Sequence, residues 1–144
     1  MIVSGRLILD DRVVPGRIEI TGGRITAVEH DPAAAGGPYI APGFVDVHVH
    51  GWGGHDAMGD TAALDGMARA LLRHGVTSFL PSGVSAPLPT LHAFTERVRR
   101  WMPVAPDDGA APLGFNLEGP FLADAKRGAH DPAMLVDPAA PGRS

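Results

Sequence analysis

The sequence contains no cysteine among its 144 residues, which excludes disulfide bonds and thiolate metal sites. It has no apolar run of about 20 residues, the length that a membrane-spanning helix requires. Its first residues also lack the basic start and apolar stretch of a signal peptide. Acidic residues outnumber basic ones, 16 to 12, which argues against a general nucleic-acid surface. We therefore expect a cytoplasmic protein whose partner is a small-molecule substrate, with neither nucleic acid nor membrane.

Hydrophobic residues make up 44% of the chain, which is enough to build a core. The first forty residues alternate in the manner of β-strands, and short strands are expected at residues 2–9, 16–20 and 24–29. Gly22 and Gly23 separate the last two strands and predict a two-residue hairpin turn. Residues 30–38 are interpreted as a loop. Residues 1–40 are thus a small β domain that must pack against something else.

The pattern changes to alternating strands and helices after Pro42. Strands are expected at residues 44–49, 76–80 and 113–117, and helices at residues 61–74 and 88–102. Asp60 is placed to cap the first helix, and Gly75 to end it. Strand–helix alternation predicts parallel βα units, hence an α/β fold. After Gly119 no regular element is expected, and the end of the chain is interpreted as a long loop and a tail.

Polar side chains follow one another along the strand at residues 44–49. Asp46, His48 and His50 share one face of it, because alternate residues of a strand point the same way. Imidazole is a frequent ligand of zinc and related metals, and Asp46 is placed to orient one of the rings. Seven histidines in a chain of this length can also produce such a pair by chance, so the two interpretations stay open.

Glu118 directly follows the third expected strand, and so should lie at the same end of the sheet as His50. The alternatives are a helix cap or a solvated loop residue. Taken alone, His130 and His55 are typical of surface histidines. The glycines of "GWGG" near residue 53 are interpreted as room for a substrate or as a mobile loop, since no phosphate-loop pattern follows them.

Three segments together resemble the amidohydrolase superfamily and, within it, the family of N-acetylglucosamine-6-phosphate deacetylases. They are "APGFVDVHVHGWGGHD", "GVTSFLPSGVSAP" and "NLEGPFLADAKRGAHDP". The first is shared by many amidohydrolases, and the third is far more specific. The resemblance implies a (β/α)₈ TIM-type barrel preceded by part of a β-sandwich. Residues 1–40 would belong to the sandwich, and residues 41–144 would form the first three βα units of the barrel.

The same resemblance implies a role for individual residues. Glu118 matches the glutamate that binds the catalytic metal, and His48 and His50 match a pair that binds a second metal in some members. His130 matches the histidine that contacts the acyl carbonyl, and Ala129 its backbone neighbour at the sugar. The family uses a divalent metal, here expected to be zinc with iron or another divalent ion as alternatives. Activated water attacks the acetamide, and acetate and glucosamine 6-phosphate are released.

Many binuclear amidohydrolases bridge their metals through a carboxylated lysine on a strand. Lys126 is the single lysine of this chain and lies in a loop, so Glu118 fits better as the bridge. The resemblance further implies a homodimer for the full-length family protein.

A complete barrel takes about 250 residues, so we expect an incomplete barrel and a truncated chain. The catalytic aspartate of the family would lie beyond residue 144. Whether 144 residues are active alone therefore stays open. The alternatives are a deacetylase for another N-acetyl amino sugar phosphate, and a remnant without catalysis.

Overall fold

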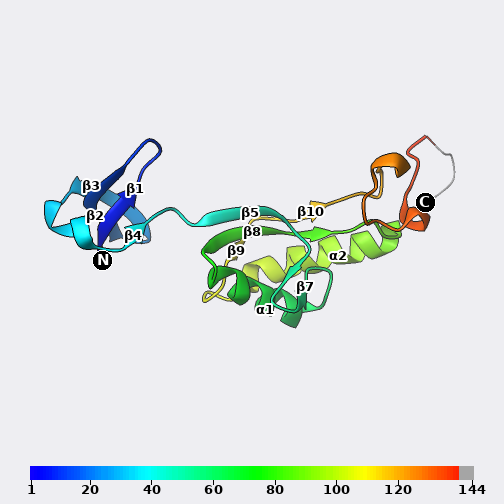
Figure 1. The fold of residues 1–144 in the computed structure, drawn as a ribbon. Coiled ribbons are helices and arrows are strands. Elements are labelled where there is room, and N and C mark those ends of the chain that lie inside the picture. Colours follow the sequence, from blue (N-terminus) through cyan, green and yellow to red (C-terminus); the bar gives the residue numbers. More distant parts are fainter. Residues whose placement is uncertain (140–144) are drawn as a thin grey trace. The chain divides into compact units, whose positions relative to one another are not determined.

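The computed structural model describes residues 1–139, which divide into two compact units at Pro42 and Gly43 (Figure 1). The first unit is built from strands alone apart from one short helix, and the second combines parallel strands with two long helices. The predicted α/β fold class is therefore confirmed. Within the described residues, no helix is both long enough and apolar enough to cross a membrane.

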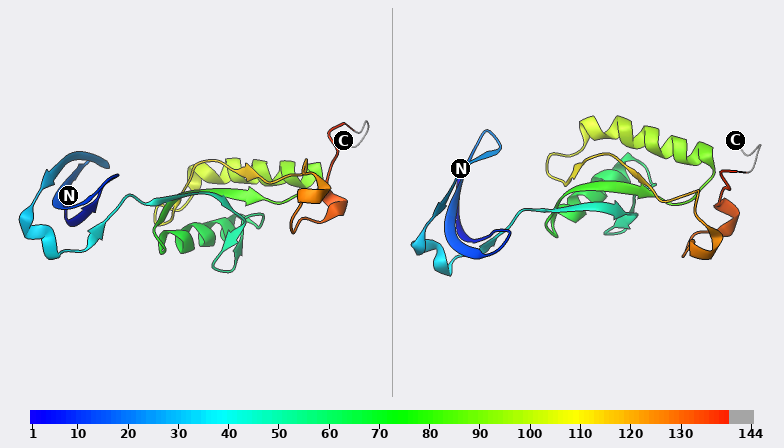
Figure 2. Two further views of the ribbon diagram at one scale, coloured as in Figure 1. Left: turned by 45° about the horizontal axis from the view of Figure 1, so that its top comes forward. Right: turned by 90° about the horizontal axis from the view of Figure 1, so that it is seen from above.

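The first unit contains one four-stranded sheet with the order β3-β2-β1-β4. Its strands are β1 (Ile2–Ile8), β2 (Val13–Thr21), β3 (Arg24–His30) and β4 (Tyr39–Ile40). β2 pairs antiparallel with both β1 and β3, and the strands curve strongly (Figure 2). Gly22 and Gly23 adopt φ angles of 58° and 75° between β2 and β3, which confirms the predicted hairpin turn.

The segment after β3, predicted as a loop, contains a turn of 3₁₀ helix, η1 (Pro32–Gly36). The Asp31 side chain accepts a hydrogen bond from the backbone N–H of Ala33 and so caps this turn. Ala34 of η1 and Leu7 of β1 are the buried apolar residues of this unit. An Asp-Pro start followed by small residues is the signal that a loop interpretation overlooked.

The second unit is organised around a parallel sheet with the order β10-β8-β5 (Figures 1 and 2). Its main elements are β5 (Phe44–Val49), α1 (Thr61–Leu72), β8 (Val76–Gly83), α2 (Leu88–Trp101) and β10 (Asn116–Leu117). Asp60 accepts from the backbone N–H of Ala63 and caps α1 as predicted. Because the strands are parallel, the carboxyl-terminal ends of β5 and β10 lie at the same end of the sheet.

Two strands of the second unit differ from their predicted lengths, and β2 of the first unit starts three residues before its predicted start. β8 continues through Pro81 to Gly83, although proline and glycine usually argue against the interior of a strand. The third predicted strand is reduced to β10 and to a separate short strand, β9 (Ala111–Pro112), both parallel to β8. Gly114 between them has a φ of 153°, so the chain leaves the ladder there.

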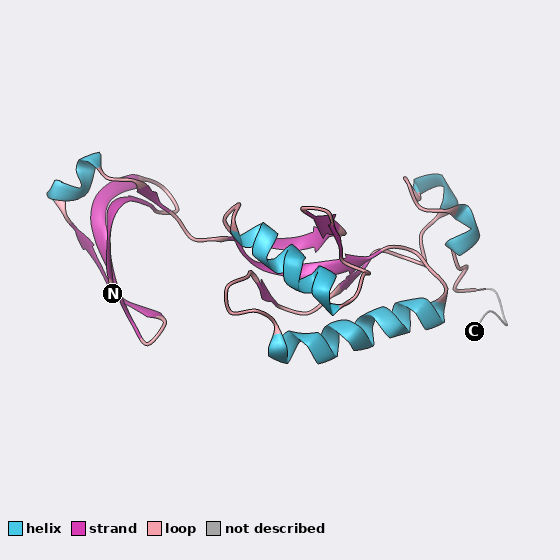
Figure 3. Ribbon diagram, turned by 90° about the horizontal axis from the view of Figure 1, so that it is seen from below, coloured by secondary structure: helices cyan, strands magenta, loops and turns pink. Residues whose placement is uncertain are grey.

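The core of this unit lies where the two helices meet the sheet (Figure 3). Phe79 of β8 is fully buried, and its ring packs edge-on against Trp101 of α2 at 6.3 Å between centroids. The remaining large side chains of the core come from α1 (Leu64, Met67, Leu71) and α2 (Phe94, Val98). Trp101 also donates a hydrogen bond from Nε1 to the Asp65 carboxylate of α1, at 2.7 Å, which joins the helices.

The glycine cluster after His50 forms a hairpin. Gly51 and Gly54 line a cavity of about 520 Å³ together with His50, so the expected room for a substrate stays a prediction. The hairpin consists of β6 (Gly51–Trp52) and β7 (His55–Asp56), which pair antiparallel. Gly53 and Gly54 make the turn with φ angles of 62° and 84°. In the expected long segment after Gly119, residues 120–139 carry two short 3₁₀ helices, η3 (Asp124–Lys126) and η4 (Pro132–Met134).

Candidate metal centre

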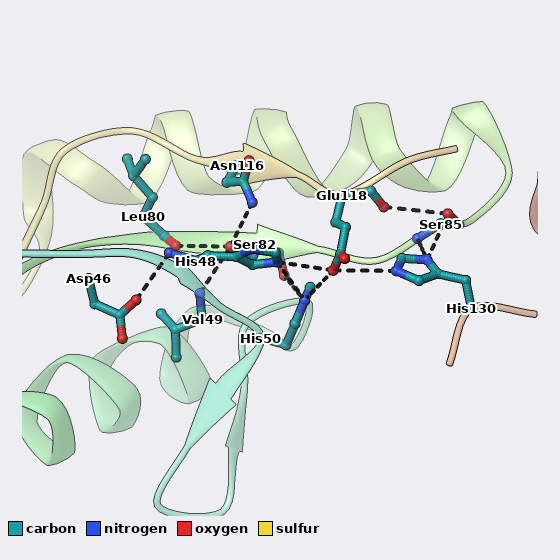
Figure 4. A network of polar contacts seen from close by, with 10 residues as sticks. All are labelled: Asp46, His48, Val49, His50, Leu80, Ser82, Ser85, Asn116, Glu118 and His130. Atoms are coloured by element: carbon teal, nitrogen blue, oxygen red, sulfur yellow. Dashed lines mark hydrogen bonds and ion pairs between the residues drawn. The ribbon is translucent and has the colours of Figure 1, made fainter. Parts of the chain in front are cut away.

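The ends of β5 and β10 bring His48, His50 and Glu118 together beside β8 (Figure 4). The Oε2 atom of Glu118 lies 3.0 Å from Nε2 of His48 and 2.8 Å from Nε2 of His50. The two Nε2 atoms are 3.1 Å apart. Glu118 is 70 residues from His48 and 68 residues from His50 in the sequence, yet the three side chains place their ligand atoms in one small triangle.

This triangle fits a single divalent cation. Ligand atoms about 2.0–2.2 Å from a tetrahedral zinc ion lie about 3.3–3.6 Å from one another. The three observed distances, 2.8–3.1 Å, require the atoms to separate only slightly to reach that spacing. The side chains of His48, His50 and Glu118 keep exposed fractions of 47%, 39% and 34%, so an ion and a substrate have access to the triangle. Within residues 1–139, this is the group whose donor set suits a metal.

Side chains replace part of the β-ladder where the histidines lie. The register between β5 and β8 shifts between Asp46 and Val49. The backbone N–H of His48 donates to Oδ1 of Asp46 at 3.0 Å, and that of Val49 donates to Oγ of Ser82 at 3.1 Å. Side-chain oxygens therefore accept from these two backbone N–H groups where the strand leaves the regular ladder.

The predicted role of Asp46 requires correction. Its carboxylate binds the backbone of its own strand and makes no hydrogen bond to an imidazole within the described part of the chain. An aspartate two residues before a backbone N–H can satisfy that group locally, and this contact competes with reaching a ring. Asp46 shapes the strand that carries the histidines and does not orient either ring.

A backbone carbonyl orients His50 instead. Nδ1 of His50 lies 3.0 Å from the carbonyl oxygen of Ser82. Because a carbonyl only accepts, Nδ1 carries a hydrogen. A neutral ring held in this way presents its Nε2 lone pair, and a ring protonated at both nitrogens donates from Nε2 to Glu118. Nε2 is the atom that faces Glu118, so the neutral tautomer is the one that can bind a cation.

Glu118 is held as a carboxylate by its neighbours. Burial alone raises the pKa of the Glu118 carboxyl, but hydrogen bonds from His48, His50 and His130 outweigh burial and lower the pKa below its usual value. A carboxyl with a lowered pKa keeps its negative charge at neutral pH. The site therefore offers an anionic ligand between imidazoles, which suits a divalent cation.

His130 joins this site and is not a surface residue, so the interpretation drawn from its sequence position alone is wrong. Its side chain is only 8% exposed, and its Nε2 lies 3.3 Å from Oε2 of Glu118. A cavity of about 420 Å³ opens beside it. Ala129 and Glu118 line this cavity together with Val84, Lys126 and Arg127. The substrate-contacting residues suggested by the family resemblance, Ala129 and His130, therefore border a space next to the triangle.

Sequence reasoning missed three residues of the site. Ser82 and Ser85, which are 1% and 6% exposed, make hydrogen bonds to the site from β8 and the loop after it. Arg127 holds the backbone carbonyl of His130 with a 2.9 Å hydrogen bond. A serine in "PSGVSAP" carries no signal of this kind, because its partners lie more than thirty residues away. His55 lies against α1, outside the triangle.

A centre of two imidazoles and a carboxylate at the ends of parallel strands defines a class of metal-dependent α/β enzyme. Comparison with known proteins narrows the class. The amidohydrolase family profile matches residues 39–136. The chain belongs to the amidohydrolase family.

Curated relatives point in the same direction. N-acetylgalactosamine-6-phosphate deacetylase of Escherichia coli O157:H7 is 38% identical over 132 residues, which cover 88% of this chain and 33% of the relative. N-acetylglucosamine-6-phosphate deacetylase of Bos taurus is 39% identical over 141 residues, which cover 92% of this chain and 31% of the relative. The chain thus spans about a third of the length of these curated relatives.

Solved structures of the same kind share the fold. N-acetylglucosamine-6-phosphate deacetylase of Thermotoga maritima superposes with a TM-score of 0.83 at 32% identity, covering 94% of this chain and 36% of that protein. The enzyme of Mycobacterium smegmatis, solved as a variant in complex with N-acetyl-D-glucosamine-6-phosphate, gives a TM-score of 0.76 at 31% identity. That match covers 96% of this chain and 37% of the other.

Proposed function

We propose that this chain provides part of the active site of a divalent-metal-dependent deacetylase that converts N-acetylglucosamine 6-phosphate to glucosamine 6-phosphate and acetate. The observation that carries the proposal is the convergence of His48, His50 and Glu118 within 2.8–3.1 Å of one another. The names of the curated relatives supply the substrate class. Residues 1–40 are proposed as part of a β-sandwich, and residues 41–144 as the first βα units of a (β/α)₈ barrel.

In this proposal His48, His50 and Glu118 hold the cation, with zinc as the expected ion and iron or another divalent metal as the alternative. A bound divalent cation supplies Lewis-acid polarisation and lowers the pKa of water. His130 donates a hydrogen bond from Nε2 to the acyl oxygen of the substrate, and the backbone of Ala129 lies along the sugar. These two residues border the 420 Å³ cavity, which supports their assignment.

The sugar isomer also needs to be tested. The relative from Escherichia coli O157:H7 is named as a deacetylase of N-acetylgalactosamine 6-phosphate, not of the glucosamine isomer. Acetate release should be measured with the zinc-loaded purified gene product and three substrates: N-acetylglucosamine 6-phosphate, N-acetylgalactosamine 6-phosphate and unphosphorylated N-acetylglucosamine. The proposal expects the first to give the highest kcat/KM. Preference for the second would assign the other sugar, and absence of metal-dependent release from all three would contradict deacetylation and favour a remnant without catalysis.

The proposal also includes a homodimer and a location in the cytoplasm. The homodimer is inferred from the family resemblance, and the location is the expectation drawn from the sequence. Analytical ultracentrifugation of the purified gene product tests the first, and fractionation of cells that express it tests the second.

A further inference from the structure

The ring of His130 is fixed on the side that faces away from Glu118. Its Nδ1 atom lies 3.2 Å from the backbone nitrogen of Ser85 and 2.8 Å from the hydroxyl oxygen of the same residue (Figure 4). Ser85 is 6% exposed, and the His130 side chain is 8% exposed. Water therefore has little access to this contact, and the partners of Nδ1 are the two polar groups of Ser85.

The chemistry of these two groups decides where the ring hydrogen lies. A backbone N–H can only donate, so Nδ1 of His130 must accept with its lone pair. The hydroxyl of Ser85 lies closer to Nδ1 than to the carbonyl oxygen of Glu118, 2.8 Å against 3.4 Å, and so donates to the ring. A neutral imidazole that accepts at Nδ1 carries its hydrogen on Nε2.

We propose that Ser85 is a positioning residue, which holds His130 as the Nε2–H tautomer, with that N–H facing Glu118 at the border of the cavity that both residues line. The assignment to the reaction rests on the proposed function, in which the acyl oxygen of the substrate accepts this hydrogen bond. A carbonyl oxygen needs a donor and gains more from it as negative charge develops there during attack. The tautomer itself does not depend on the reaction.

His50 provides an internal comparison, because its ring meets the same oxygen of Glu118 with the opposite tautomer. The carbonyl of Ser82 takes a hydrogen from Nδ1 of His50 and leaves Nε2 free to bind a cation. The N–H and hydroxyl of Ser85 give hydrogens to Nδ1 of His130 and leave Nε2 as a donor. Ser82 thus leaves His50 able to bind a metal, and Ser85, three residues later, leaves His130 as a hydrogen-bond donor.

Neighbouring contacts hold both partners in place. Arg127 donates from Nη1 to the carbonyl oxygen of His130 at 2.9 Å and from Nε to the Asp124 carboxylate at 2.9 Å. A Cβ atom at Gly119 would collide with Oγ of Ser85, so the hydroxyl fits closely against the loop that follows β10. The contact between Ser85 and His130 therefore joins the loop after β8 to the segment after β10.

Nuclear magnetic resonance of the metal-free chain tests the tautomer directly. Long-range ¹H–¹⁵N correlation identifies which ring nitrogen carries the hydrogen, and the measurement belongs at about pH 8, where imidazole is neutral. We expect His130 of the wild type to be wholly Nε2–H. Ser85→Ala keeps the backbone N–H at 3.2 Å from Nδ1 but removes the closer hydroxyl at 2.8 Å. With the weaker contact alone, this variant should show detectable Nδ1–H, and Ser85→Thr should restore the wild-type pattern. Ser78→Ala, which removes a hydroxyl from β8 with no hydrogen bond found for it within residues 1–139, is the matched control.

A hydrogen on Nδ1 of His130 in the wild type would overturn the tautomer. An identical tautomer ratio in the wild type and Ser85→Ala would overturn the role of the Ser85 hydroxyl, because the backbone N–H alone would then hold the ring. If Ser85→Ala does not fold, Ser85→Cys keeps a similar shape with a much weaker donor and serves in its place.

Kinetics of the zinc-loaded gene product separates this inference from the proposed function. Ser85→Ala should lower kcat by about tenfold, less than the loss of about 10²–10³ for removing a transition-state donor itself. KM and zinc content should change by less than about twofold, because the metal ligands are untouched. Absence of acetate release by the wild type would remove the proposed function and leave the tautomer result standing. Normal kcat in Ser85→Ala would overturn the positioning role, whatever the substrate.

Discussion

The ring of His55 lies directly on Gly66 of α1, so that a Cβ atom at residue 66 would collide with the imidazole. Alanine normally stabilises a helix interior by about 1 kcal/mol relative to glycine. Here we expect Gly66→Ala to destabilise the chain, because the hairpin of β6 and β7 would have to move. In a His55→Ala background the collision is absent, and Gly66→Ala should stabilise by about 0.5–1 kcal/mol.

The wild type, the two single variants and the double variant form a double-mutant cycle. Their free energies of unfolding are compared by urea unfolding at equilibrium. The sign of the Gly66→Ala effect should differ between the two backgrounds. The same sign in both would show that the hairpin is not packed on α1 in solution.

Ser82 ties the three central strands together, which predicts a large effect of removing its hydroxyl. Its Oγ accepts from the backbone N–H of Val49 on β5 and from the side-chain amide of Asn116 on β10. Ser82 is only 1% exposed, so Ser82→Ala would leave these two donors without a partner at a buried position. We expect a loss of about 1–3 kcal/mol in the free energy of unfolding. Ser78→Ala on the same strand is the control, and an equal loss there would remove the explanation.

The hydrogen bond between Trp101 and Asp65 predicts a difference between two substitutions of the same aspartate. Trp101 is 2% exposed, so Asp65→Ala would bury an indole N–H without an acceptor, at a cost of about 1–3 kcal/mol. Asp65→Asn keeps an acceptor oxygen and should cost clearly less. Thermal unfolding followed by circular dichroism distinguishes the two. Equal losses would indicate that the carboxylate charge, and not the acceptor, is what α2 requires.

Sequence reasoning predicted those parts of the fold that depend on neighbours along the chain. The bounds of β5, the hairpin at Gly22 and Gly23, and the cap at Asp60 follow from residue alternation, turn glycines and a capping aspartate. The extension of β8 through Pro81 was not predictable in this way. Parallel neighbours on both sides of β8 outweigh the poor strand propensity of proline and glycine there.

The same distinction applies to the candidate site. His48, His50 and Glu118 were predictable, because parallel strands bring the residues at their ends together. The ring partners of His50 and His130 were not, since a backbone carbonyl of Ser82 and the backbone N–H and hydroxyl of Ser85 supply them from more than thirty residues away. Asp46 was misjudged because its nearest N–H donor lies two residues away on its own strand.

The carboxylate of Glu118 and the tautomer of His130 predict different effects of two substitutions on metal binding. Glu118→Gln keeps the shape of the side chain but removes the charge that lies 2.8–3.0 Å from two imidazoles. Loss of an outer partner alone costs about 10–100-fold in metal affinity, so loss of this direct ligand should weaken zinc binding by at least about 100-fold. His130→Asn should leave zinc affinity within a few-fold of the wild type, because Nε2 of His130 presents a hydrogen and not a lone pair. Isothermal titration with zinc and metal analysis after dialysis measure both variants.

Equal loss of zinc in the two variants would place His130 among the ligands, and unchanged zinc in Glu118→Gln would move the metal away from the triangle. Where acetate release is measurable, His130→Asn should lower kcat while zinc stays bound, because the acyl oxygen then loses its donor and the cation keeps its three ligands.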